Sequence, residues 1–254
     1  MPFLFPTDQP RVFAHRGLAI AADGTPIDEN TLPAFARALE VGAQYIESDI
    51  QVTADGVPVL FHDDDLSRVA GLPSPVNKLN LAELQAIELV NGGQIPTLVE
   101  ALREFPTARF NLDFKSVSSI LAGTAAISSI GAQGRVLVAS FSDARRLAAL
   151  NKLPGAATSA GASRVLRAAL GAAMRSSILT GIPLTGVHAV QVPQNFGKLR
   201  LDNERFVSMV AEAGVETHFW TINEPEEMKR LVALGARGII TDRADLAAEF
   251  LGLA

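Results

Sequence analysis

The chain has 254 residues, of which 48% are hydrophobic and 19% are charged, as in ordinary globular proteins and unlike disordered ones. Its formal net charge is −5, so it lacks the basic surplus expected of a protein that binds a nucleic-acid backbone. It contains no cysteine, which excludes disulfide bonds, thiol catalysis and cysteine-ligated zinc.

The first residues do not have the pattern of an export signal. The segment before Arg11, MPFLFPTDQP, has neither the basic start nor the long apolar stretch of a signal peptide. No apolar run approaches the length of a transmembrane helix. We therefore expect a cytoplasmic protein with no nucleic-acid partner and no stable membrane insertion. The sequence does not indicate an oligomeric state.

The first predicted elements are a buried strand and a helix. Arg11–Ala14 is an apolar run of strand type, and it ends at His15-Arg16-Gly17. Thr31 is placed to cap a helix over Leu32–Val41, which Gly42 would end. Together they make the first strand–helix unit of the chain.

Residues 45–63, YIESDIQVTADGVPVLFHD, are predicted to form a β-hairpin. Two alternating runs rich in β-branched residues are joined by Thr53-Ala54-Asp55-Gly56. Asp-Gly favours a tight turn because glycine accepts a positive φ without a Cβ clash. A turn on Asp55-Gly56 sets Glu47 opposite His62 in the antiparallel pairing.

Two carboxylates lie within the first arm of this hairpin. Glu47 and Asp49 are two residues apart and therefore share a face of the strand, and a residue directly opposite shares that face too. The hairpin thus brings both carboxylates together with His62. Two such carboxylates near an apolar interior repel each other and are costly to desolvate unless a cation or protons compensate.

Beyond the hairpin, residues 64–96 are less regular, with a short helix predicted over Leu81–Leu89, and Thr97 is placed to cap a helix over Leu98–Phe105. Strands and helices then alternate. The predicted strands are Arg109–Phe114, Val136–Ser140, Ala156–Ala160, Ala189–Val192, Glu216–Thr221 and Gly238–Thr241. The helices between them include Asp143–Asn151, Ala162–Ala173, Glu204–Ala213 (capped by Asp202 or Asn203) and Glu226–Ala233.

Counting the first strand and the strand that carries Glu47, this gives eight parallel strands, as in a (β/α)8 TIM barrel, with the hairpin at the barrel mouth. An open doubly wound sheet is the alternative, but it would need a glycine-rich phosphate loop where His15-Arg16-Gly17 stands. We expect one domain over residues 1–254, with an insertion segment at about 50–96.

In such a barrel the carboxyl ends of the strands form the catalytic face. The residues predicted at these ends are His15, Arg16, Glu47, Asp49, Asp113, Lys115, Trp220 and Asn223. Asp113, which alternation places on one face with Asn111 and Lys115, would complete an oxygen cage suited to Mg²⁺ or Ca²⁺. The alternative for Asp113 is a simple ion pair with Lys115.

The remaining polar residues suggest acid–base chemistry on an anion. His15 and His62 each end an apolar strand, which suits a pair of proton-transfer groups, whereas His188 and His218 lack such company. The cations Arg16 and Lys115 could grip an anion. Glu29 could orient Arg16 or His15, or could simply belong to the helix-capping segment. Trp220 could line a ligand-binding cavity or belong to the hydrophobic core. Together these groups indicate phosphoryl transfer.

The sequence resembles the glycerophosphodiester phosphodiesterase family, barrel enzymes related to phosphatidylinositol-specific phospholipase C, over nearly its whole length. The resemblance rests on a series of short motifs in this order: His15-Arg16-Gly17, Glu29-Asn30-Thr31, Glu47-Ser48-Asp49, Thr53-Ala54-Asp55-Gly56, His62-Asp63, Leu66-Ser67-Arg68, Ile95-Pro96-Thr97-Leu98, Trp220-Thr221-Ile222-Asn223 and Gly238-Ile239-Ile240-Thr241-Asp242.

The resemblance implies metal-dependent hydrolysis of a small glycerophosphodiester to sn-glycerol 3-phosphate and an alcohol. It assigns the metal, Mg²⁺ or Ca²⁺ with Mn²⁺ as a further candidate, to Glu47, Asp49 and Asp113. It also assigns acid–base catalysis to His15 and His62, and phosphate contact to Arg16 and Lys115. The chain departs from the family at Asp113, where the family usually has the longer glutamate.

The sequence leaves several alternatives open. The same site could act on single-chain lipids, as a lysophospholipase D-like or sphingomyelinase D-like phosphodiesterase, and an apolar mouth would favour that substrate. A barrel that only binds phosphorylated ligands is a third interpretation, against which the histidines and carboxylates argue. The pattern does not assign which histidine is the acid, nor choose between direct hydrolysis and a cyclic phosphate intermediate.

Overall fold

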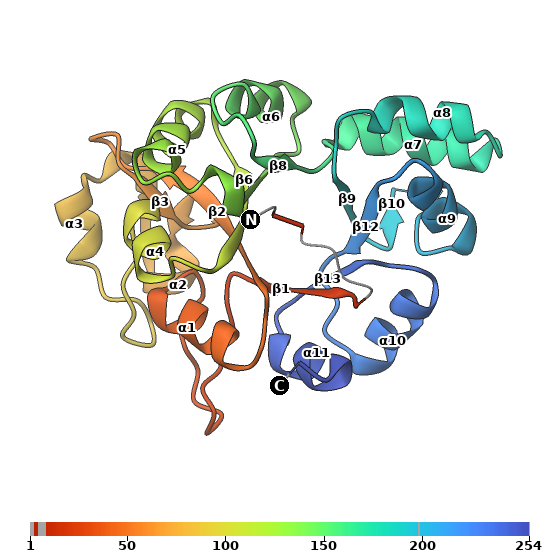
Figure 1. Cartoon of the computed structure of the whole chain (residues 1–254). Coiled ribbons are helices and arrows are strands. Elements are labelled where there is room, and N and C mark those ends of the chain that lie inside the picture. The colour runs from red at the N-terminus through yellow and green to blue at the C-terminus, as the bar shows by residue number, and fades with distance from the viewer. Residues whose placement is uncertain (1–2, 5–8, 198, 254) are drawn as a thin grey trace.

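Eight parallel strands stand in a ring that is enclosed by helices in the computed structural model, which describes residues 3–4, 9–197 and 199–253 (Figure 1). The strands are β1 (Arg11–His15), β2 (Tyr45–Val52), β6 (Arg109–Phe114), β7 (Val136–Ala139), β8 (Ala157–Thr158), β9 (Ala189–Val192), β12 (Glu216–Phe219) and β13 (Gly238–Thr241). Their neighbour order is β8-β7-β6-β2-β1-β13-β12-β9.

The ring is nearly closed between β8 and β9. One bridge joins Ser159 to Ala189, and the His188 N–H donates to the Thr158 carbonyl oxygen at 2.8 Å. This junction is weak because β8 has only two residues, whereas the sequence predicted a strand over Ala156–Ala160. The predicted (β/α)8 barrel is confirmed.

A helix follows each of the eight strands. These helices are α1 (Leu32–Glu40), α4 (Leu98–Glu104), α5 (Val117–Ser129), α6 (Asp143–Leu150), α7 (Ala162–Ala173), α9 (Glu204–Glu212), α10 (Pro225–Ala233) and α11 (Ala244–Leu251). The predicted caps form: the side chains of Thr31, Thr97 and Asn203 each accept a backbone hydrogen bond from the first turn of their helix. Short additional elements are α8 (Ser177–Gly181), β10 (Asn195–Phe196), β11 (Leu199–Arg200) and 3₁₀ turns at Gln133–Arg135 and Ile182–Leu184.

The hairpin forms, but its predicted register is wrong by one residue. β3 (Pro58–Leu60) pairs antiparallel with β2, and Ile50 lies opposite Leu60, so the strict pairing of Glu47 with His62 does not occur. The loop holds three residues, closed by the Thr53 N–H donating to the Val57 carbonyl oxygen at 3.0 Å. Gly56 takes the positive φ of +85° that this longer loop requires.

The rest of the insertion is a compact layer beside the barrel. It contains β4 (Asp65–Leu66), α2 (Ser67–Ala70), β5 (Leu72–Pro75), a 3₁₀ turn at Val76–Lys78 and α3 (Leu81–Gln85). The predicted helix over Leu81–Leu89 therefore ends four residues early. Its own small core includes Phe61, Leu66 and Leu84. The buried Asp28 carboxylate ties the end of the insertion to the barrel by accepting the backbone N–H groups of Asn91 and Gly93.

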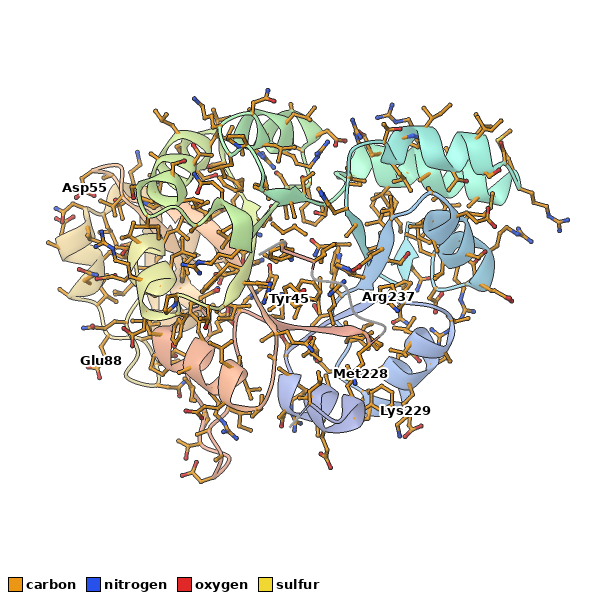
Figure 2. The ribbon with its side chains drawn as sticks, in the orientation of Figure 1. Tyr45, Asp55, Glu88, Met228, Lys229 and Arg237 are labelled. Atoms are coloured by element: carbon orange, nitrogen blue, oxygen red, sulfur yellow. The ribbon has the colours of Figure 1, made fainter. Side chains whose placement is uncertain are left out.

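The amino ends of the strands form a floor built around Tyr45. Figure 2 shows Tyr45 inside the ring, whereas Glu88 and Lys229 lie at its outer edge. Phe13 stacks on the Tyr45 ring at a centroid distance of 4.5 Å. Beside it, Arg11 donates two hydrogen bonds to Glu216, which also pairs with the fully buried His218. No helix among the described residues is long and apolar enough to cross a membrane.

Candidate active site

A cavity of about 240 Å³ opens at the carboxyl ends of the strands. Of the residues that the sequence placed at this face or assigned to chemistry, those that line the cavity are His15, Arg16, Glu47, Asp49, His62, Asp113, Lys115 and Trp220. Glu29 and Asn223 are outside the lining and bind Arg16 and Asp242. His62 reaches the cavity despite the changed hairpin register because it lies two residues beyond the end of β3 and so outside the alternation of the ladder.

A strained turn after β1 places His15 and Arg16. Arg16 has a φ of +58°, and Gly17, at +85°, lies so close to α1 that a Cβ would be 2.8 Å from the Ala34 backbone. Only glycine fits there, which explains the residue order of this motif. The turn lets the Arg16 N–H donate to the Glu47 carbonyl oxygen at 3.0 Å, joining β1 to β2 at the site.

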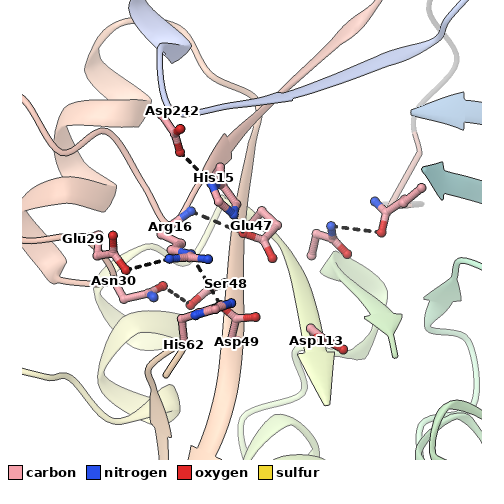
Figure 3. Close-up of polar contacts among 12 residues, drawn as sticks. His15, Arg16, Glu29, Asn30, Glu47, Ser48, Asp49, His62, Asp113 and Asp242 are labelled. Atoms are coloured by element: carbon pink, nitrogen blue, oxygen red, sulfur yellow. Dashed lines mark hydrogen bonds and ion pairs between the residues drawn. The ribbon is translucent and has the colours of Figure 1, made fainter. Parts of the chain in front are cut away.

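His15 is held by a carboxylate from the far end of the chain. Its Nδ1 lies 2.6 Å from Asp242 Oδ1 (Figure 3). Asn223 donates to the other oxygen of Asp242 at 2.8 Å. The free nitrogen, Nε2, lies 3.9 Å from Glu47 Oε2. Burial alone would lower the pKa of His15, but the Asp242 hydrogen bond and the Glu47 charge outweigh it and raise the pKa.

His62 is held in the same way by its neighbour in sequence. Its Nδ1 lies 2.6 Å from Asp63 Oδ1, and Arg68 binds the second oxygen of Asp63 at 2.7 Å. Arg68 also binds Glu29, which in turn accepts a hydrogen bond from Arg16 at 2.9 Å. Of the alternatives for Glu29, the contact with Arg16 is the one that forms, and this network links the insertion to the β1 turn.

The carboxylates that the sequence assigned to a metal lie on neighbouring strands. The parallel register of β2 and β6 sets Asp49 beside Asp113 and Glu47 beside Asn111. The Lys115 ammonium lies between the two aspartates, 2.8 Å from Asp49 Oδ1 and 3.3 Å from Asp113 Oδ2. The ion pair between Asp113 and Lys115 therefore forms, together with a shorter one to Asp49.

One lysine does not fully compensate this cluster. Burial and the charge of Asp49 raise the pKa of Glu47 to about 8. Burial raises the pKa of Asp113 to about 6 against the opposing effect of Lys115. Asp49 Oδ2 and Asp113 Oδ1 are buried and have no hydrogen-bond partner among the described residues. Additional positive charge would lower the cost of burying these groups.

The carboxylates of this cluster have the chemistry of ligands for a divalent ion. Carboxylate oxygens are the donors that Mg²⁺ and Ca²⁺ prefer, and these two oxygens accept no hydrogen bond from a described residue, although Asp49 Oδ2 lies 3.9 Å from Arg16 Nε. In the described part of the chain, no three Asp, Glu or His side chains already stand as a ready ligand set. The donor chemistry therefore fits such an ion, with the Lys115 ammonium as its competitor.

The opposite wall of the cavity is apolar. It comes from the carboxyl end of β9, from the segments after β7, β8 and β9, and from Trp220. Its side chains include Phe141, Ala160, Val165, Val192 and Phe196. Trp220 and Phe141 meet edge to face at a centroid distance of 6.1 Å, and Phe141 is 59% exposed. Trp220 both lines the cavity and packs against the buried cluster that contains Phe13 and Ile240, and its contact with a ligand stays a prediction.

Sequence reasoning did not assign the groups behind the two histidines. Asp63 and Asp242 lie in two of the motifs named above, but the sequence pattern predicted no catalytic or supporting role for either. A signal existed for each. Asp63 follows His62 directly, and Asp242 follows β13, the strand that pairs with β1 once the ring closes.

Comparison with known proteins decides the family. A model described as the glycerophosphoryl diester phosphodiesterase family matches residues 15–246, a range that contains every cavity residue named above. The chain belongs to this family. It is accordingly a phosphoric diester hydrolase of the glycerophosphodiester phosphodiesterase class.

Relatives within the family match almost the whole chain. A probable glycerophosphodiester phosphodiesterase of Mycobacterium tuberculosis is 34% identical over 239 residues, covering 94% of this chain and 89% of the relative. A lysophospholipase D of Homo sapiens is 24% identical, covering 88% and 82%. A phosphodiesterase structure from Oleispira antarctica, in complex with the product sn-glycerol-3-phosphate, has the same fold, with a TM-score of 0.76, 24% identity, and coverage of 96% and 97%.

Proposed function

We propose that this chain hydrolyses glycerophosphodiesters to sn-glycerol 3-phosphate and an alcohol, with a divalent metal ion and with His15 and His62 as the acid–base pair. The observation that carries the proposal is the common geometry of the two histidines. Each is bound at Nδ1 by a carboxylate at 2.6 Å, and both line one cavity with three further carboxylates. The Nδ1 bond leaves Nε2 as the nitrogen that exchanges a proton with the substrate.

In this proposal the two histidines divide the proton transfers. A neutral imidazole whose Nδ1–H donates to a carboxylate accepts a proton at Nε2, and a protonated one gives it back there. One histidine takes the proton of the attacking hydroxyl, either of water or of the glycerol 2-position, and the other protonates the leaving alcohol. Asp242 and Asp63 keep the rings oriented, and Asp242 also raises the pKa of His15.

Arg16 and Lys115 are the proposed phosphate contacts. Arg16 offers a planar guanidinium that Glu29 holds in place, and its Nε is buried without a hydrogen-bond partner among the described residues. Lys115 offers a point charge from the other side of the carboxylate cluster. A phosphate in the cavity would satisfy the Arg16 donor and compete with Asp49 and Asp113 for the Lys115 ammonium.

Glu47, Asp49 and Asp113 are the residues proposed to hold the divalent ion. When bound, such an ion would stabilise the negative charge that develops on the phosphate oxygens. Asp113 is one methylene shorter than the glutamate usual in the family, so its carboxylate extends less far from β6. The support for these ligands is the oxygens of Asp49 and Asp113 that accept no hydrogen bond within the described part of the chain and the raised pKa values of Glu47 and Asp113.

The experiment is an assay of glycerophosphocholine and glycerophosphoethanolamine after chelation, with Mg²⁺, Ca²⁺ or Mn²⁺ then restored. We expect sn-glycerol 3-phosphate only when a metal is present. The Asp113→Asn variant should lose metal-dependent turnover, whereas Asp113→Glu, which keeps the carboxylate, should retain it. Full turnover in chelator would contradict the metal requirement, and binding without turnover under every condition would indicate a barrel that only holds its ligand.

A second candidate substrate is a single-chain phospholipid. The apolar wall around Trp220 and Phe141 faces the carboxylate cluster across the cavity and favours an alcohol group with an acyl chain. The human relative named a lysophospholipase D is consistent with this substrate. Assaying lysophosphatidylcholine beside glycerophosphocholine separates the two, because Phe141→Ser should lower turnover of the lipid and spare that of the headgroup diester.

A further inference from the structure

One side of the barrel is opposite in charge to the rest of the chain. Residues 144–201 contain eight cationic and no acidic residues. The rest of the chain, with 14 cationic and 27 acidic residues, carries a net charge of −13. The basic stretch runs from α6 to β11, so its charge is concentrated on one sector of the ring (Figure 1).

α7 and α8 form a helical hairpin on the outside of this sector (Figure 1). Gly171 permits their contact, because a Cβ at this position would lie 2.5 Å from backbone atoms of Leu179 and Thr180. The chain reverses just after Arg175, whose φ is +58°. This close backbone contact fixes which side chains of the two helices point outward.

The outward side carries an unusual amount of exposed apolar surface. Its large apolar side chains are between 39% and 71% exposed; they are Leu166, Leu170, Met174, Ile178, Leu179 and Ile182. Single exposed apolar residues are normal on a protein surface, but a group of this kind on adjoining helices marks an interaction site. Together with Arg167 and Arg175, we call this surface the α7–α8 face.

The two arginines on the α7–α8 face are available to a partner. Arg167 binds only oxygens of Ser163, one helical turn away, and in the described part of the chain neither Arg167 nor Arg175 pairs with a carboxylate. Carboxylates at the ends of the basic stretch pair with other arginines: Asp143 binds Arg146 and Arg164, and Asp202 binds Arg200. α9, which contacts both helices, also carries acidic residues. The face therefore combines free cations with apolar side chains.

We propose that the α7–α8 face docks on an anionic lipid surface. Apolar side chains interleaved with arginines are the composition that adsorbs to the headgroup region, where cations meet lipid phosphates and apolar groups enter the acyl boundary. A second copy of this chain is a poorer partner, because a two-fold interface would set the arginines of one copy against those of the other. This adsorption needs no membrane-spanning helix.

The same helix connects this face to the cavity. Val165 of α7 and Ala162, at its start, line the cavity, while Leu166 and Leu170 point to the outside. Docking through the α7–α8 face therefore holds the apolar wall of the cavity beside the lipid surface. The docking itself is independent of catalysis and does not rest on the proposed reaction.

The test is flotation with vesicles made of phosphatidylcholine alone or of equal parts phosphatidylcholine and phosphatidylglycerol. We expect the full chain to float with the mixed vesicles at low salt, to dissociate at high salt, and to remain unbound with phosphatidylcholine alone. The double variant Arg167→Glu with Arg175→Glu should weaken binding at least about tenfold, since each cation near an anionic surface contributes appreciably. Met174→Ser with Ile178→Ser, both highly exposed positions, should weaken it by a similar factor.

The matched control is Lys78→Glu with Arg103→Glu, which makes the same change of net charge at exposed positions of the insertion and α4. It should bind like the unmodified chain, and thermal unfolding should show all variants folded. The proposal is overturned if the chain does not bind mixed vesicles, if the control loses as much binding as the α7–α8 variants, or if those variants instead abolish self-association. Flotation measures vesicle binding and does not require catalytic activity. A protein that floats but is inactive would therefore contradict only the proposed reaction.

Discussion

The two ends of this barrel bury charged groups in opposite ways. At the floor, Glu216 is bound by Arg11 through two hydrogen bonds of 2.7 and 2.8 Å and by His218 at 2.9 Å. Burial alone would raise the pKa of Glu216, but these partners lower it to about 2. At the mouth, Glu47 has a pKa of about 8, because its burial and the neighbouring Asp49 are not offset by the cations nearby.

This difference separates structural charges from functional ones. A buried charge with complete partners holds the fold together, and removing one partner is costly. Carboxylates that are crowded and incompletely paired destabilise the fold, so their presence at the mouth points to a role in binding or chemistry. The contrast predicts opposite responses at the two ends to the same chemical change.

The largest expected effect is on catalysis at the mouth. His15→Ala and His62→Ala should each lower kcat by about 10²–10⁴, the contribution typical of a lost proton-transfer group. Steady-state turnover of glycerophosphocholine measures this, with circular dichroism as the check of folding. Wild-type kcat in either folded variant would remove that histidine from the mechanism.

The floor should respond through stability instead. Glu216→Gln leaves the Arg11 guanidinium without its carboxylate and should cost about 3 kcal/mol of unfolding free energy. Urea unfolding measures the loss, and the turnover of the molecules that remain folded should be unchanged. A change below a few tenths of a kcal/mol would show that the floor pair is not a structural element.

Acid should reduce the stability that the floor residues contribute to the folded protein. The unfolded chain protonates Glu216 near its ordinary pKa of 4.5, whereas the folded protein resists until about 2, so this stability is present above pH 4.5 and is lost as the pH falls toward 2. Burial lowers the pKa of His218 below its ordinary 6.5, so the unfolded chain also gains that proton first. Urea unfolding at decreasing pH should show falling stability, with a shallower acidic slope in Glu216→Gln.

The effect expected for Glu47 has the opposite sign. At neutral pH a carboxyl with a pKa of about 8 must take up a proton on folding, which costs free energy. Glu47→Gln removes that cost and should raise the unfolding free energy of the metal-free protein at pH 7, by at most about 3 kcal/mol, which is the cost of a pKa shift from 4.5 to about 8. The measurement is urea unfolding in chelator. If Glu47→Gln were destabilised as much as Glu216→Gln, the proposed difference between the mouth and the floor would be contradicted.

Local patterns in the sequence predicted most of the fold and the nature of the site. Alternation set Glu47 and Asp49 on one face, and regular spacing gave the eight strands. The hairpin register failed because Thr53-Ala54-Asp55-Gly56 is compatible with a two- or a three-residue loop, and the three-residue loop formed.

Such local patterns do not predict contacts between segments that are distant in the sequence. Asp242 meets His15 across 227 positions, and only the pairing of β13 with β1 brings them together. The exposure of the α7–α8 face was likewise not predictable, because apolar residues spaced four apart in a helix ordinarily indicate a buried side. In α7 the buried side is instead the one that carries Val165, Ala168 and Ala172, and Leu166 and Leu170 are exposed.

The most direct test of the account compares turnover and unfolding free energy in the unmodified chain, Glu47→Gln and Glu216→Gln, each with metal restored for the assay. The account predicts that Glu47→Gln abolishes turnover while the protein stays folded and at least as stable. It predicts that Glu216→Gln loses about 3 kcal/mol of stability while each folded molecule turns over normally. Normal turnover in Glu47→Gln, or its loss in folded Glu216→Gln, would contradict the assignment of chemistry to the mouth and structure to the floor.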